Sequence, residues 1–316
     1  MKVKKEDLSN GIYKNLGVSK LGLSLDDFYY RSKKTKSIGF KIDLSKSLAE
    51  FFSKTFDLKN PDVFEEKLKQ SISGDGKEFR KNNALHSSSL CALLMFYNVS
   101  EETPFYIKFD GREHKYTEVY FEVKNKVITR PSNMDVVLVN KEANEILFVE
   151  CKFSEYKAHS DKYELPKGYQ PYKEEYFDSI PFDDMKVFPD GIKQLVAHYI
   201  GLDNFRNKKY NLDSFYPDKE DVRRKLYKNG GYSNIAFMEV IFDLHIDEFN
   251  KYKEETDKVF KLLEEKEKAV NIEPKIKMLY TKTYQELFKG ENKKILSEKV
   301  IKFYKLDKEK KKEKII

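Results

Sequence analysis

Three charged side chains stand in two segments that otherwise consist mostly of apolar, β-forming residues. Asp135 lies in MDVVLVN (134–140), and Glu150 and Lys152 lie in EILFVECKF (145–153). The four residues KEAN separate the segments, as in a β-hairpin. Because alternate residues of a strand share a face, Glu150 and Lys152 project to the same side, about 6.6 Å apart along the strand.

The centre of the hairpin loop fixes which residues face each other. A centre between Glu142 and Ala143 places Asp135 opposite Glu150, with their Cβ atoms about 5 Å apart. The same register pairs apolar residues along both faces: Val137 with Phe148, Val139 with Ile146, Val136 with Val149, and Leu138 with Leu147. We therefore expect a central, buried hairpin with two carboxylates and an ammonium group gathered at one end.

Two adjacent carboxylates repel each other, and burying each costs several kcal/mol unless it is paired or binds a metal. Oxygen ligands without a His or Cys partner favour Mg²⁺ or Mn²⁺, so we expect Asp135, Glu150 and the backbone carbonyl of Cys151 to bind such an ion. The ion would activate water and shield a phosphate, while Lys152 orients the water or stabilises the transition state. This is the chemistry of phosphodiester hydrolysis. The alternative is an ordinary ion pair at the edge of a sheet.

The surrounding pattern predicts elements that hold this hairpin in an α/β fold. Helix, three strands, helix and strand follow in that order, which indicates a mixed sheet with helices on both faces (an α-β-β-β-α-β core) and additional C-terminal helices and a strand. The expected segments are a helix at 77–97, a strand at 115–123, the hairpin strands, a helix at 190–201, a strand at 232–244, a helix at 247–269, a strand at 274–280 and a closing helical stretch.

Composition excludes several classes of protein. The 316 residues are 40% hydrophobic, 36% charged and 14% aromatic, which favours a folded chain with a highly charged surface. No apolar run reaches the length of a membrane span and the start lacks the apolar segment of a signal peptide, so we expect a cytoplasmic protein without a membrane partner. Two cysteines are too few for a disulfide framework. The net charge of +7 weakly favours a polyanionic partner.

Domain organisation follows from the less regular stretches. Residues 1–40 form an N-terminal arm or extension with a basic cluster at Arg31, Lys33, Lys34 and Lys36, read either as a DNA-touching arm or as a polar linker. Residues 41–300 form the α/β domain, interrupted at about 154–189 by a tyrosine-rich and proline-rich insertion that we interpret as a lid or dimer contact. Residues 301–316 form a charged tail.

The stretch RPSNMDVVLV followed by FVECKFSEY resembles the signature of the PD-(D/E)XK nuclease superfamily, the restriction-endonuclease-like fold. Asp135, Glu150 and Lys152 stand at its Asp, Glu and Lys positions. Met134 replaces the signature proline, and the nearest proline is Pro131. The likeness is greatest to a bacterial branch of predicted restriction endonucleases in which a Thr/Ser-Glu pair, here at 154–155, follows the ExK strand. It covers roughly residues 80–245.

The resemblance implies a Mg²⁺-dependent deoxyribonuclease acting in restriction or genome defence, with Asp135 and Glu150 on the metal and Lys152 beside the water. Because one such site cuts one strand, double-strand cleavage implies a homodimer or sequential nicking. The chain has no phosphate-cradling P-loop, so no nucleotide cofactor is expected. A structure-specific repair or recombination nuclease, and a non-catalytic DNA-binding protein of the same fold, are the alternatives. Whether the substrate is DNA or RNA stays open.

The resemblance also implies accessory residues. An upstream acid is either Glu122 or Glu118, of which Glu122 is preferred. Gln194 and His198 lie one helical turn apart and are similar to the Gln-x-x-x-aromatic element of some members, with His at the position of the usual Tyr. Ser87 and Ser88 either contact a phosphate or cap a helix, and the cap is favoured.

Overall fold

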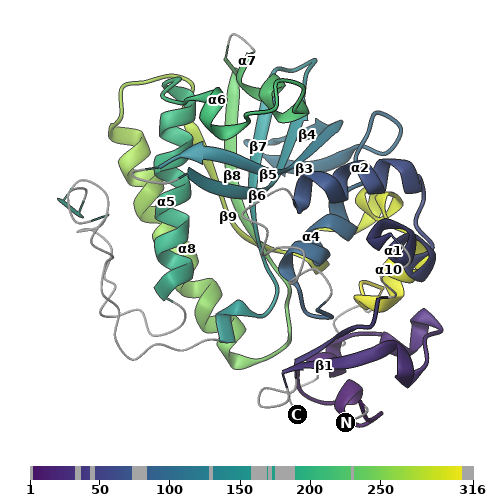
Figure 1. The fold of residues 1–316 in the computed structure, drawn as a ribbon. Coiled ribbons are helices and arrows are strands. Elements are labelled where there is room, and N and C mark those ends of the chain that lie inside the picture. The colour runs from purple at the N-terminus through teal and green to yellow at the C-terminus, as the bar shows by residue number, and fades with distance from the viewer. Residues whose placement is uncertain are drawn as a thin grey trace.

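The computed structural model describes residues 3–32, 37–42, 47–72, 84–127, 131–157, 169, 173–174, 189–228 and 231–307. The chain is an α/β protein in which a five-stranded mixed sheet packs against helices (Figure 1). Antiparallel pairing joins the first three strands and parallel pairing joins the last three. The strands, in spatial order, are β5 (Glu118–Lys126), β6 (Pro131–Asn140), β7 (Glu145–Lys152), β8 (Asn234–Ile241) and β9 (Ile276–Thr283).

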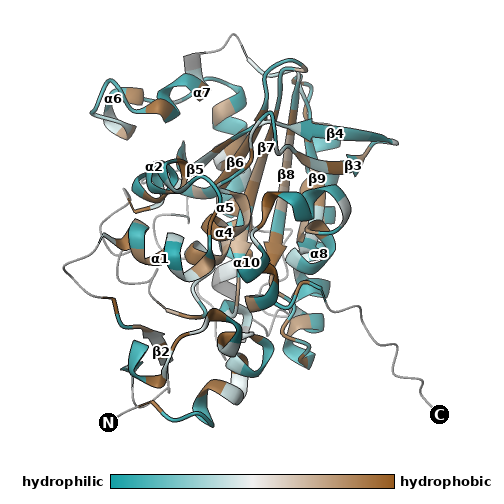
Figure 2. Ribbon diagram, turned by 90° about the vertical axis from the view of Figure 1, so that its right-hand side faces the viewer, coloured by the Kyte–Doolittle hydropathy of each residue, from teal (hydrophilic) through white to brown (hydrophobic). Residues whose placement is uncertain are grey.

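Helices cover both faces of this sheet and enclose two apolar cores. One core lies between the sheet and the pair α5 (Pro189–Arg206) and α8 (Asp247–Ala269), which pack side by side in Figure 1. The strands between the layers are mostly apolar, as the brown ribbon of Figure 2 shows. The second core lies on the other face, under α1 (Leu48–Phe56), α2 (Pro61–Ser71), α4 (Ser88–Phe96) and α10 (Glu298–Phe303).

The predicted register of the central hairpin is confirmed. Val137 pairs with Phe148 and Val139 with Ile146, while Val136–Val149 and Leu138–Leu147 pair as well. All of these side chains are buried, those of residues 137, 139, 146 and 148 in the core under α5 and α8, and the rest in the opposite core. The four-residue connection between Asn140 and Glu145 sets this register, and both faces of the paired runs are apolar and buried.

Two predicted boundaries are wrong. The helix predicted at 77–97 begins only after Ser87, whose Oγ accepts a hydrogen bond from the Leu90 N–H at 3.1 Å. Ser87 is therefore the helix cap, as favoured from the sequence. Ala84 instead bridges to Gly39, and residues 73–83 lie outside the described part of the chain.

The strand predicted at 115–123 is in fact the end of one strand and the beginning of another. β4 (Arg112–Tyr116) pairs with β3 (Phe105–Phe109) in a separate two-stranded sheet, and β5 begins at Glu118. The alternation of side chains runs across this junction without a turn residue. No signal in the sequence therefore marked the change of sheet.

Several other predictions are confirmed with small shifts. The helix predicted at 247–269 has those bounds in α8, and the strands and helix predicted at 232–244, 274–280 and 190–201 correspond to β8, β9 and α5. The closing stretch contains α9 (Tyr284–Leu287), a 3-10 turn at Gly290–Ile295 and α10. Elements not foreseen are α1, α2, α6 (Leu212–Phe215), α7 (Lys225–Lys228), β3, and the hairpin of β1 (Phe28–Ser32) and β2 (Ser37–Phe40).

Both ends of the described chain contribute to the core. Apolar residues of the predicted N-terminal arm, among them Tyr13, Leu16, Phe28 and Phe40, are buried together with the side chains of α1 and α10. Tyr304 and Leu306 of the predicted tail are buried as well, whereas 308–316, like the basic residues 33–36, lie outside the described residues. No helix within the described ranges is long and apolar enough to cross a membrane.

Most of the predicted insertion at 154–189 lies outside the described residues, so its interpretation as a lid or dimer contact stays a prediction. Its first residues are ordered against the core. Glu155 accepts hydrogen bonds from the backbone N–H groups of Phe153 and Ser154 at 2.7 and 2.8 Å. Tyr156 is fully buried and donates a hydrogen bond to the Phe242 carbonyl at 2.8 Å.

Gly201 lets α5 approach the sheet. A Cβ at this position would lie 2.9 Å from the Asn125 Cβ and 3.3 Å from the Ser132 Oγ. We expect Gly201→Ala to destabilise the fold by about 1–3 kcal/mol, because overpacking outweighs the roughly 1 kcal/mol that alanine gains in helix propensity. Urea unfolding at neutral pH measures this change. A variant as stable as the wild type would contradict the close packing of α5 on β5 and β6.

Candidate active site

Glu150 lies at the centre of a buried charged cluster at one end of β7. Its side chain is 1% exposed and forms an ion pair with Lys152, whose side chain is 8% exposed. On the other side, His198 Nε2 lies 2.8 Å from Glu150 Oε2. Gln194 Oε1 accepts a hydrogen bond from Lys152 Nζ at 2.8 Å. Two residues of α5, one helical turn apart, therefore face the Glu-x-Lys residues of the strand.

Gln194 and His198 point toward the interior of the protein. Most described residues from 191 to 200 are buried, and His198 is 0% exposed. α5 packs against β5, β6 and α8. The polar pair is therefore an interior contact of the cluster.

The charges around Glu150 stabilise its ionised form. Burial alone would raise the pKa of Glu150, but the Lys152 ammonium and His198 lower it to about 2. Burial alone would lower the pKa of Lys152, but Glu150 and Asp135 raise it above its ordinary value. Lys152 is therefore a permanent cation at neutral pH. The contact between His198 and Glu150 is short but poorly aligned, and neither ring nitrogen of His198 has a well-aligned hydrogen bond within the described structure.

Asp135 lies where the pairing of β6 and β7 ends. The paired residues extend from Asn140–Glu145 to Val136–Val149, and beyond them Asp135 Oδ2 accepts a hydrogen bond from the Cys151 N–H at 2.7 Å. Burial, followed by the charges of Glu150 and Glu122, raises the pKa of Asp135 well above its ordinary value. Of the two carboxylates predicted to bind metal, Asp135 therefore has the negative charge that is less compensated by its neighbours.

Of the two candidate upstream acids, Glu122 lies beside Asp135 and Glu118 does not. The pairs Phe121–Val136 and Val123–Met134 flank Glu122 and Asp135, so these acids lie at the same level of neighbouring strands, and the charge of Glu122 acts on Asp135. Glu122 is 6% exposed and has a φ of 50°. Glu118 is four residues away along the strand and pairs with Lys141. The structure therefore brings the preferred candidate to the cluster.

A further acid, Glu239, belongs to the cluster and was not singled out in the sequence. It is the residue of β8 that pairs in parallel register with Glu150, and it is fully buried. The Tyr252 hydroxyl of α8 donates a hydrogen bond to its Oε1 at 2.7 Å. The sequence offered one signal for Glu239, namely that it is the single acid in the apolar run IAFMEVIF. No motif connects that run to the ExK strand.

The pKa shifts of Glu239 and Glu150 have opposite signs, so these residues should change the stability of the fold in opposite directions as the pH rises. Burial raises the pKa of Glu239 from 4.5 to about 8, so protonated Glu239 stabilises the fold fully below its unfolded pKa, and this stability is lost as the pH rises through about 8. The pKa of Glu150 is lowered from 4.5 to about 2, so its contribution is present above pH 4.5 and is lost as the pH falls toward about 2.

We therefore expect Glu239→Gln to flatten the stability profile between about pH 4.5 and pH 8 and to leave the loss of stability below about pH 4.5 unchanged. Urea unfolding at intervals from about pH 4 to pH 9 measures this range. The wild-type chain should lose stability as the pH rises from about 4.5 to about 8, and the variant should lose less. Parallel profiles of the two proteins over this range would contradict the assignment to Glu239.

The donor set fits a hard divalent cation in part. Asp135 and Glu150 supply carboxylate oxygens at the end of the hairpin. Because the N–H and C=O of a strand residue point to the same neighbouring strand, the Cys151 carbonyl faces β6 with its N–H. No group of three His, Cys, Asp or Glu side chains within the described ranges is arranged to hold a metal. The carbonyl, waters and substrate oxygens would have to complete the coordination, as is common for Mg²⁺.

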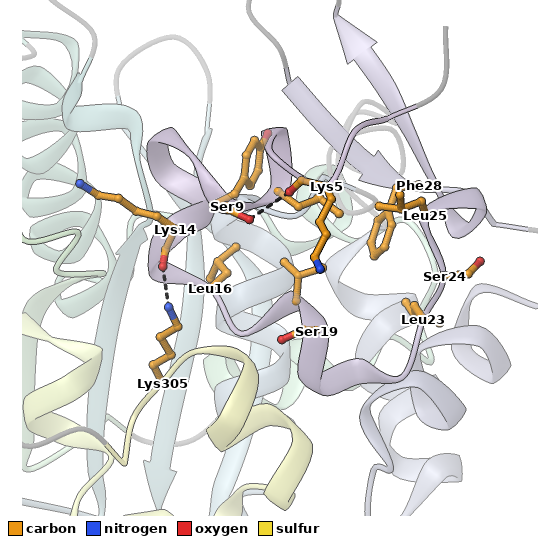
Figure 3. A pocket seen from close by; sticks show the side chains of 13 residues that line it. Lys5, Ser9, Lys14, Leu16, Ser19, Leu23, Ser24, Leu25, Phe28 and Lys305 are labelled. Atoms are coloured by element: carbon orange, nitrogen blue, oxygen red, sulfur yellow. Dashed lines mark hydrogen bonds between the residues drawn. The ribbon is translucent and has the colours of Figure 1, made fainter.

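Two cavities lie away from this cluster. One, of about 540 Å³, is lined by N-terminal residues together with Lys305, and its rim carries Lys5 and Lys14 (Figure 3). A second, of about 740 Å³, lies at the opposite end of the sheet, next to Glu145, the first residue of β7. Neither is lined by Asp135, Glu150 or Lys152. The cluster is thus an internal site at the end of a strand and not the floor of either cavity.

Comparison with known proteins places the chain in no family: no family model, no curated protein and no solved structure matches it. The geometry of the cluster is therefore the principal evidence on what the chain does.

Proposed function

We propose that the chain is a metal-dependent nuclease that hydrolyses phosphodiester bonds in DNA, with a restriction-endonuclease-like fold. The observation that carries the proposal is the convergence of Asp135, Glu150 and Lys152 at the end of one hairpin, where the charge of Asp135 is poorly compensated. A divalent cation is the simplest partner for that charge. The elements α4, β5, β6, β7, α5 and β8 follow in the order of the predicted core, with β3 and β4 inserted before β5 and α6 and α7 inserted before β8.

Each residue of the cluster has a role that follows from its contacts. Mg²⁺ or Mn²⁺ held by Asp135, Glu150 and the Cys151 carbonyl would activate water and neutralise phosphate charge when bound. Lys152 stays protonated, so it donates hydrogen bonds to the attacking water or a phosphate oxygen and cannot serve as a base. Gln194 orients the Lys152 ammonium through its hydrogen bond, and the His198 ring lies against the Glu150 carboxylate, with Nε2 2.8 Å from Oε2.

A plasmid-nicking assay tests the proposal. Purified protein is incubated with supercoiled DNA in Mg²⁺, in Mn²⁺ and with EDTA, alongside Lys152→Ala and Glu118→Gln. We expect metal-dependent nicking by the wild type and by Glu118→Gln, whose carboxylate lies outside the cluster, and none by Lys152→Ala. Circular dichroism shows whether Lys152→Ala is folded. Equal nicking by folded Lys152→Ala would refute the mechanism, and preference for branched over linear DNA would indicate a repair or recombination nuclease.

A non-catalytic DNA-binding protein is the second candidate, and the burial of the cluster favours it. The side chains of Glu150 and Lys152 are 1% and 8% exposed, and each already has an ionic partner. A scaffold needs no metal. Titration calorimetry with Mn²⁺ separates the two, because a chain that binds DNA and no Mn²⁺ would support the scaffold.

A further inference from the structure

Glu122 occupies an unusual backbone conformation on an edge strand. β5 is the first strand of the sheet, so among the described residues no strand pairs with one side of its backbone. At Glu122 the φ angle is 50°, a left-handed conformation that costs an ordinary residue about 1 kcal/mol or more. The alternation of side chains breaks there. Tyr120 and Val123 are three residues apart and should lie on opposite faces, yet both pack in the core under α5. Something other than the ladder must hold this conformation.

Side chains from outside the sheet bind the open edge of β5 around Glu122. Arg223 Nη1 donates hydrogen bonds to the carbonyls of Phe121 and Glu122, each at 3.3 Å. Gln70 Oε1 accepts a hydrogen bond from the Phe121 N–H at 3.2 Å. Two residues further on, the Tyr216 hydroxyl accepts a hydrogen bond from the Lys124 N–H at 2.8 Å. These groups replace the missing strand.

Arg223 is itself fixed within the interior. It is 5% exposed, and Asp221 accepts two hydrogen bonds from its guanidinium, at 2.6 and 2.9 Å. The Tyr216 ring lies over the guanidinium, 4.8 Å from its central carbon. A planar guanidinium can bind a carboxylate with one edge and backbone carbonyls with the other, which a lysine cannot do.

We propose that Arg223 is a positioning residue that fixes the left-handed backbone of Glu122 and thereby holds the Glu122 carboxylate beside Asp135, where its negative charge strengthens the binding of a divalent cation. This inference rests on the proposed nuclease function. Glu122 is 6% exposed and lies at the level of Asp135 on the neighbouring strand, so a change in its φ would move the carboxylate relative to Asp135.

The test compares Arg223→Gln with Arg224→Gln, a matched control. Arg224 is also buried, at 8% exposure, but it binds Asp213 and the carbonyls of Leu212 and Tyr216 and makes no recorded hydrogen bond to β5. For each variant we would measure Mn²⁺ affinity by calorimetry, kcat and KM for nicking, and urea unfolding. Arg223→Gln should weaken Mn²⁺ binding about ten-fold and lower kcat more than KM, whereas Arg224→Gln should change both less than two-fold.

A double-variant cycle distinguishes positioning from general destabilisation. In a Glu122→Gln background, Arg223→Gln should weaken Mn²⁺ binding less than two-fold further, because the two residues act through the same carboxylate. Should Arg223→Gln not fold, Arg223→Lys replaces it and is expected to weaken Mn²⁺ binding as well. Equal affinities of the Arg223 and Arg224 variants, or additive effects in the cycle, would overturn the inference alone. A wild type that neither binds Mn²⁺ nor nicks DNA would overturn the inference and the nuclease function together.

Discussion

Lys152→Met is expected to destabilise the fold by about 3–5 kcal/mol at neutral pH, the usual cost of breaking a buried ion pair from one side. Glu150 is 1% exposed and would keep a buried charge without its main counter-ion. Methionine has a similar length, so the loss reflects charge more than packing. Urea unfolding measures the change, with the slope of the transition as a check on two-state behaviour.

Two further variants make this prediction specific. Lys54→Met removes a lysine whose partner Glu50 and own side chain are 43% and 71% exposed, and it should change stability by less than about 0.5 kcal/mol. The double variant Glu150→Gln/Lys152→Met removes both charges and should recover much of the lost stability. If Lys152→Met were no more harmful than Lys54→Met, the buried pair would not be a central element of the fold.

Asp135→Asn is expected to abolish metal binding and cleavage while the fold remains at least as stable as that of the wild type. Burial and the neighbouring charges of Glu150 and Glu122 raise the pKa of Asp135, so its charged form is unfavourable in the folded chain without a cation. The amide keeps the shape of the side chain. The rate of nicking should fall by about 10³-fold or more, the equivalent of several kcal/mol of lost transition-state stabilisation.

This combination of results distinguishes a functional carboxylate from a structural one. Thermal unfolding without added metal and nicking in Mg²⁺ are measured on the same preparation. Because the folded-state pKa of Asp135 is raised, the stability advantage of Asp135→Asn should be absent at low pH and should grow as the pH rises. A variant that loses stability at neutral pH and keeps its nicking rate would show that Asp135 has a structural role.

The central hairpin was the most predictable part of the site. A four-residue loop centred between Glu142 and Ala143 sets the register, and that register places Asp135 at the level of Glu150. α8 was equally clear, since Phe249, Tyr252, Val259, Phe260 and Leu263 are buried at helical spacing in an otherwise charged segment. In both cases the local pattern is set by burial alone.

The contacts that complete the site could not be predicted in this way. Glu239 meets Glu150 only because β7 and β8 pair in parallel, with more than eighty residues between them in the chain. Arg223 reaches β5 because that strand lies at an edge, which depends on the order of the whole sheet. Such contacts between distant segments depend on topology, and the periodicity of a single segment carries no information about them.

The most direct test of the nuclease proposal is the anomalous electron density of crystals grown with Mn²⁺. We expect a peak between the carboxylates of Asp135 and Glu150, within about 2.5 Å of an oxygen of each, and no such peak in crystals of Asp135→Asn. Crystals of the wild type that contain Mn²⁺ in the solvent, yet show Lys152 and His198 as the only partners of Glu150 and no peak beside Asp135, would contradict the account.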